Sequence, residues 1–112
     1  MFLMNKNEKP ALRLPKGVIQ FDSDIGKRIG ASALIGTGYF WSDGDALTFA
    51  DFIPHYRNLE PLREFIQAMQ CSQIQLIFPE PDTLLQQILT PFEPEIVLSV
   101  SDLNEDIVLW CI

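Results

Sequence analysis

The stretch Gly36-Thr-Gly-Tyr-Phe-Trp-Ser-Asp-Gly-Asp-Ala-Leu-Thr-Phe-Ala-Asp-Phe-Ile-Pro-His-Tyr56 concentrates the unusual residues of this sequence. It holds six of the twelve aromatic residues, the only histidine and three carboxylates. Residues 39–41 and 46–49 are β-prone runs around Ser42-Asp-Gly-Asp45. Asp-Gly between such runs favours a hairpin turn, because glycine can adopt a positive φ. Strand alternation places Tyr39 and Trp41 on one face of this hairpin and Phe40 on the other.

The chain after this hairpin predicts two helices and three further strands. Residues 51–57 predict a short turn, because aromatic residues there have helical spacing while Pro54 suits only a first turn. A helix follows from about residue 60, with Pro61 in its first turn and an apolar stripe at Leu59, Leu62, Phe65, Ile66 and Met69. Alternation predicts a strand over 73–78, and Pro81 can open the next helix. Residues 96–100 and 107–112 are two β runs joined by a polar loop.

The chain before the hairpin is less regular. Residues 1–16 predict a flexible N-terminal arm, and residues 17–21 predict a first strand. Over residues 25–38 a roughly helical apolar stripe competes with four glycines, and a strand entered through a flexible turn is the favoured interpretation. The glycine spacing matches neither common phosphate-binding pattern, so no phosphate site is predicted.

Together these elements predict a single α+β domain over residues 17–112. Its sheet is mixed or antiparallel, with about five or six strands and two helices packed on it. A strand–helix–strand unit over residues 73–100 is long enough for a right-handed crossover between parallel strands. A chain of 112 residues with 47% hydrophobic residues can bury a core of its own.

Charge divides the sequence into two parts. Residues 1–28 carry six Lys/Arg against three Asp/Glu, a net charge of +3, whereas residues 29–112 carry two against twelve, a net charge of −10. An acidic body repels nucleic acid and anionic membranes, so we expect neither as a direct partner. It attracts a basic protein, which is the predicted partner. The alternative is that net charge only keeps a small protein in solution.

The two cysteines and the N-terminus indicate the compartment. Cys71 and Cys111 fit no metal or redox spacing, and both are expected to be small buried hydrophobic residues. The sequence shows no secretory signal pattern and no apolar run long enough to span a bilayer. These features predict a cytoplasmic protein.

The strongest candidate for enzyme chemistry is the group Asp43, Asp45, Asp51 and His55. Asp51 and His55 are four residues apart, which would place them on one face of a helix, where a carboxylate can orient an imidazole as general base. Pro54 interrupts that helix, and no second histidine is present to help hold a metal. We therefore predict no catalytic residue, no metal and no cofactor. A small enzyme or ligand-binding domain using His55 and Asp51 in an aromatic pocket remains the alternative.

The aromatic group around Trp41 fits either a core layer or a surface anchor beside carboxylates. The surface interpretation predicts a non-enzymatic binding module that covers a basic surface of a partner protein. In size and charge such a module resembles inhibitors of the immunity-protein and viral-inhibitor types. The predicted binding residues are Tyr39, Trp41, Asp43, Asp45 and Asp51 at the first hairpin and Asp102, Glu105 and Asp106 at the second. A further alternative is a structural subunit of a complex or homodimer, paired through the continuously apolar C-terminal strand.

Overall fold

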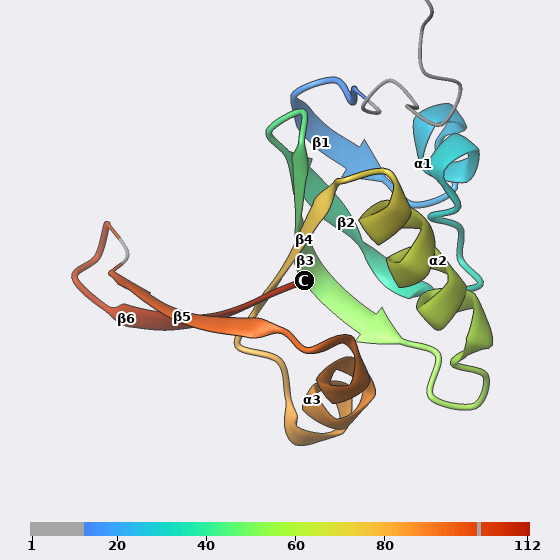
Figure 1. Cartoon of the computed structure of the whole chain (residues 1–112). Helices are drawn as coiled ribbons and strands as arrows, with labels where there is room; N and C mark the ends of the chain where they lie inside the picture. The colour runs from blue at the N-terminus through green and yellow to red at the C-terminus, as the bar shows by residue number, and fades with distance from the viewer. Residues whose placement is uncertain (1–12, 101) are drawn as a thin grey trace, which may run out of the picture.

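The computed structural model describes residues 13–100 and 102–112, and it contains one six-stranded mixed sheet with three α-helices (Figure 1). The predicted α+β class is confirmed, with one helix more than expected. The elements in chain order are β1 Gly17–Gln20, α1 Asp24–Ile29, β2 Gly36–Ser42, β3 Ala46–Pro54, α2 Glu60–Cys71, β4 Gln75–Pro79, α3 Thr83–Leu89, the 3-10 helix η1 Thr90–Phe92, β5 Glu95–Val100 and β6 Asp106–Cys111.

The region before β2 contains the additional helix. The Ser23 hydroxyl accepts a hydrogen bond from the Gly26 N–H and caps α1, and Gly30 ends the helix in the left-handed conformation at φ 92°. Residues 1–12 of the predicted N-terminal arm lie outside the described residues. The rest of that arm is attached to the domain, because Leu14 is buried and its N–H donates to the Gly44 carbonyl at 3.2 Å.

The strands lie in the order β1-β2-β3-β4-β6-β5, and β3 with β4 is the parallel pair. Helix α2 makes the crossover between these two strands. The strand–helix–strand unit predicted over residues 73–100 is present as β4, α3 and β5. Both strands are antiparallel to β6, which lies between them, so β4 and β5 run parallel and β5 forms the edge of the sheet. The continuously apolar C-terminal run thus takes the inner position, where it is flanked by a strand on each side.

The core lies between the sheet and the helices, with α1 and α2 on the same side of the sheet (Figure 1). The predicted stripe of α2 supplies Leu62, Phe65, Ile66 and Met69, all buried. From the sheet, Phe49 contributes most to the aromatic packing, with its ring centroid 4.8 Å from that of Phe40 and 4.1 Å from that of Phe78. The predicted β2–β3 hairpin is confirmed, with Phe40, Leu47 and Phe49 facing the core.

Strand β3 contains a bulge that the sequence pattern did not predict. Between the pairs Tyr39–Ala50 and Thr37–Ile53, two residues of β3, Asp51 and Phe52, oppose the single residue Gly38. Because the extra residue shifts the alternation, Phe49 and Phe52 both contact the core although they are three positions apart. The turn predicted over residues 51–57 is therefore wrong at its start. The helical spacing came from a bulged strand.

The cysteine prediction is also corrected. Cys71 is exposed at the end of α2, outside the buried stripe of that helix, and Cys111 is half-buried. Neither forms a disulfide. Within the described part of the chain, no helix combines the length and apolar character needed to cross a bilayer.

A substitution at Gly38 tests whether the bulge in β3 requires the close backbone approach seen there. The φ of Gly38 is 136°, and a Cβ there would lie 2.8 Å from the Ala50 carbonyl oxygen. We expect Gly38→Ala to lower the free energy of unfolding by about 1–3 kcal/mol, measured by urea denaturation. Gly17→Ala is the control, because Gly17 also has a positive φ, 115°, but has no atom within 4 Å of the added Cβ. Equal losses in the two variants would show that the bulge does not require close approach at Gly38.

Candidate functional site

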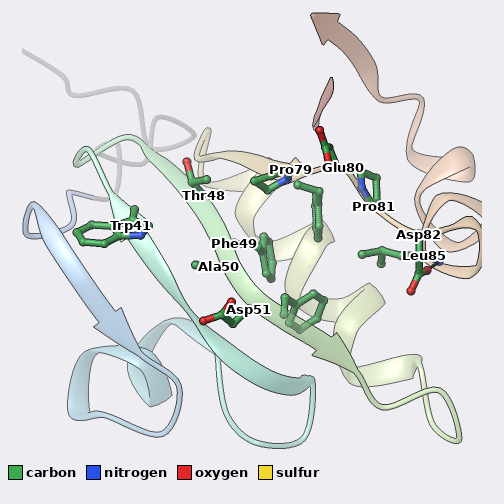
Figure 2. A pocket seen from close by; sticks show the side chains of 12 residues that line it. Trp41, Thr48, Phe49, Ala50, Asp51, Pro79, Glu80, Pro81, Asp82 and Leu85 are labelled. Atoms are coloured by element: carbon green, nitrogen blue, oxygen red, sulfur yellow. Dashed lines mark hydrogen bonds between the residues drawn. The ribbon is translucent and has the colours of Figure 1, made fainter. Parts of the chain in front are cut away.

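Strands β3 and β4 separate after three paired residues. They pair from Ala46–Gln75 to Thr48–Ile77, after which β3 bulges and β4 ends at Pro79. A hollow of about 490 Å³ lies at this divergence (Figure 2). It is formed at the carboxyl ends of two parallel strands, the region where open α/β sheets commonly bind ligands. We call it the β3–β4 hollow.

The β3–β4 hollow has apolar walls and a polar rim. Aromatic and aliphatic side chains from both strands and α3 form the walls: Phe49, Phe52, Phe78 and Leu85. In Figure 2, Trp41, Ala50 and Asp51 lie on one side of β3 and Phe49 on the other. The Trp41 side chain is 54% exposed, and its ring centroid lies 6.1 Å from that of Tyr39. The aromatic group is thus divided, with the phenylalanines in the core and Trp41 at the surface.

Two carboxylate residues at the rim have left-handed backbone conformations. Asp51 has φ 50° in the bulge and Glu80 has φ 40° just after β4. The Glu80 N–H donates to the Val108 carbonyl at 2.8 Å, which fixes the chain at this point. Such conformations are unfavourable for residues with a Cβ and are concentrated at functional sites. The bulge brings Asp51 to the rim of the hollow, on the same side of β3 as Trp41.

A third carboxylate, Asp82, has a structural role. Its Oδ1 accepts the Leu85 N–H at 2.8 Å and caps α3. Its Oδ2 accepts the Tyr56 hydroxyl at 3.1 Å, so the loop after β3 is connected to the start of α3. Burial raises the pKa of Tyr56, and the hydrogen bond to Asp82 and the charge of Asp82 raise it further. Folding therefore favours the neutral phenol. This contribution to stability is present below the ordinary tyrosine pKa and is lost as the pH rises through the raised value.

Tyr56 can be titrated alone in a Tyr39→Phe background, because the chain has two tyrosines. We expect its ionisation, followed by ultraviolet absorbance, above the ordinary pKa of 10.0. Asp82→Asn should lower this pKa, because asparagine keeps the helix cap and removes the charge. A pKa unaffected by Asp82→Asn would show that the hydrogen bond does not form in solution.

His55 does not join Asp51 in one site. Residues 51–54 belong to a strand, so the helix that would have placed the two side chains on one face is absent there. His55 is exposed, and its Nε2 is 2.5 Å from the Ala33 carbonyl oxygen, to which the protonated nitrogen donates. It lines a separate shallow hollow beside Leu34, whereas Asp51 lines the β3–β4 hollow. Within residues 13–100 and 102–112, no three His, Cys, Asp or Glu residues are grouped so as to hold a metal.

The structure divides the predicted binding residues into three places. Tyr39, Trp41 and Asp51 lie at or beside the β3–β4 hollow. Asp43 and Asp45 flank the β2–β3 turn, where Lys16 approaches Gly44. The remaining three lie on the β5–β6 hairpin, which projects away from that turn (Figure 1): Asp102, Glu105 and Asp106. Sequence reasoning missed Glu80 and Asp82 as residues that line the hollow. The sequence signal that could have located them is Pro79-Glu-Pro81, because the two prolines mark the abrupt end of β4.

Among the residues that the structure describes, no ion pair neutralises the carboxylates of the first hairpin. In the described ranges 13–100 and 102–112, Arg63 and Glu60 form one salt bridge at 4.0 Å, and both side chains are exposed. Asp43, Asp45 and Asp51 form no ion pair and accept no side-chain hydrogen bond from other described residues. Their charge therefore faces solvent.

Comparison with known proteins found no matching family model, curated protein or solved structure. What this site can bind is therefore inferred from its residues.

Proposed function

We propose that this chain is an acidic protein-binding module that covers a basic surface of a partner protein. The observation that carries the proposal is the position of Trp41, which is 54% exposed at the rim of the β3–β4 hollow. Beside it lies the carboxylate of Asp51, which forms no ion pair with other described residues. Tryptophan side chains are highly buried on average, so an indole that is half exposed favours an anchoring role.

The chemistry of the rim suits a lysine or arginine side chain. A cation over the face of Trp41 gains about 0.5–2 kcal/mol, depending on how far it is desolvated. A charge-assisted hydrogen bond to Asp51 adds about 1.5–3 kcal/mol. The apolar walls below can accept the aliphatic part of the same side chain, because lysine and arginine bury their methylene groups against apolar surface.

Long-range electrostatics support the same partner. Residues 64–112 contain eight Asp/Glu and no Lys or Arg. The sum of these charges accelerates encounter with a basic surface by roughly 10- to 1,000-fold at low ionic strength, and salt reduces the effect. Lys16 weakens the potential near the β2–β3 turn, so we place the contact centre at Trp41 and Asp51.

An inhibitory role follows if the covered surface is the partner's working site, as in immunity-type and viral-inhibitor-type antagonists. We place the protein in the cytoplasm. The support for a reducing compartment is that Cys71 and Cys111 are both free thiols.

The acidic residues are tested by capturing partners on the immobilised protein and comparing variants by quantitative mass spectrometry. Asp43→Asn, Asp45→Asn and Asp51→Asn together should release a basic protein that the wild type retains, and should slow its association measured at low salt. The control is Glu60→Gln, Glu64→Gln and Glu93→Gln, which removes the same charge elsewhere. If control and test variants lose the partner equally, only net charge matters and the proposed surface is wrong.

Trp41 is tested on the same captured protein. We expect Trp41→Ala to raise the dissociation rate at least tenfold, because an anchor residue contributes about 2 kcal/mol or more. The melting temperature should change little, since the side chain is already half exposed. Tyr39→Ala is the comparison, because Tyr39 lies on the same strand face but is more buried. A binding loss confined to Tyr39→Ala would move the contact away from the hollow.

A further inference from the structure

The β5–β6 hairpin carries a second surface whose features are independent of the β3–β4 hollow. Figure 1 shows this hairpin projecting from the body, away from α1 and α2. Strand β4 pairs with residues 109–111 of β6, so no strand of the described chain lies beside the part of the hairpin nearer its turn. We call residues 95–100 and 106–111 the arm.

One face of the arm is largely apolar, with Asp106 opposite Val100 as its charged residue, and no other described element covers it. Phe78 pairs with Trp110, which pairs with Ile96, so these side chains continue the core face of the sheet. Beyond Trp110 this face is exposed, at 58% for Ile96, 65% for Leu98 and 66% for Val100. Contiguous apolar patches of this kind mark interaction sites on monomeric proteins.

Strand β5 is the edge of the sheet, and its outer side presents main-chain groups that no described strand pairs with. Ile112 exchanges two hydrogen bonds with Leu76, and the Val108 carbonyl accepts the Glu80 N–H, so alternate residues of β6 point their main-chain groups to β4. The intervening residues of β6 point to β5 and pair there with Glu95, Val97 and Ser99. The N–H and C=O groups of Ile96, Leu98 and Val100 must therefore point outward.

This edge lacks the features that protect natural edge strands. Residues 95–100 contain no lysine, no proline and no bulge. The three residues whose main-chain groups point outward are all apolar. An antiparallel strand can pair with it residue by residue.

We propose that the occupant is a second copy of this chain, joined through antiparallel pairing of the two β5 strands. A two-fold axis through Leu98 pairs Leu98 with Leu98 and Ile96 with Val100 of the second copy. All three outward residues then form hydrogen-bonded pairs, and the apolar faces of both arms lie on the same side. A second copy also brings a strand that is already formed, whereas a flexible peptide would lose conformational freedom on docking.

Charge opposes this pairing but does not prevent it. The register brings Glu95 of one copy toward the turn end of the other, which carries Asp102 and Asp106, and all three residues are exposed. An exposed charge pair changes an equilibrium constant by roughly fivefold or less, and salt screens it. The small contact area predicts a weak dimer with a dissociation constant on the order of micromolar. Dimerisation should strengthen as salt is added, opposite to the binding of a basic partner.

Sedimentation equilibrium tests the dimer. We expect the mass of the wild type to rise with concentration from 12.8 kDa toward twice that value. Leu98→Lys should keep the monomer mass at every concentration, with an unchanged circular dichroism spectrum showing that it folds. The matched control, Leu84→Lys on α3, changes another exposed leucine, 56% exposed, and should dimerise like the wild type. A wild type that remains monomeric at millimolar concentration, or a dimer unaffected by Leu98→Lys, overturns the proposal.

Disulfide trapping tests the register in a Cys71→Ser, Cys111→Ser background. Leu98→Cys alone should form a covalent dimer on mild oxidation, because paired residues on adjacent strands lie within disulfide distance. Ile96→Cys mixed with Val100→Cys should give at least fivefold more covalent dimer than either variant alone. Equal yields from Leu98→Cys and Leu84→Cys would indicate random collision and overturn the register.

Discussion

An apolar sheet face has to be covered by another element, and the helices of this protein cover only part of it. The α2 stripe and the buried residues of α3 enclose the central strands, where Phe49 and Phe78 stack at 4.1 Å. The same face continues through Trp110 to Leu98, where the side chains are exposed. The core and the proposed dimer surface are therefore two parts of one sheet face. The helices cover the first part and do not reach the second.

The bulge in β3 links the core to the candidate site. An extra residue in one strand reverses the alternation of side chains beyond it, so that Phe52 returns to the core and Asp51 remains outside. The regular parallel pairing of β3 with β4 ends at Thr48–Ile77, just before the bulge, and the β3–β4 hollow lies at that separation. Packing of the phenylalanines and exposure of the carboxylate thus have a common geometric cause.

The acidic charge acts on the two surfaces in opposite ways. At the hollow, carboxylates that form no ion pair with other described residues favour the cationic ligand that we propose. At the arm, the same excess of negative charge makes two copies repel each other. The free energy gained from the apolar contacts must be larger than this repulsion for the dimer to form. Salt changes these two interactions in opposite directions, which allows them to be distinguished in one protein.

The sequence by itself determined the elements whose periodicity is regular. The α2 stripe, the Asp43-Gly44 hairpin turn and the C-terminal pair of strands all follow from local spacing, and the charge asymmetry follows from composition. Only the tertiary structure decided the bulge at Asp51, since its i, i+3 phenylalanine spacing is the same as that of a helix turn. The tertiary structure also decided the strand order, because β5 and β6 are both apolar and local spacing does not say which of them lies beside β4. The hollow joins residues 41, 51 and 80 from three separate segments, and no local pattern contains the distance between them.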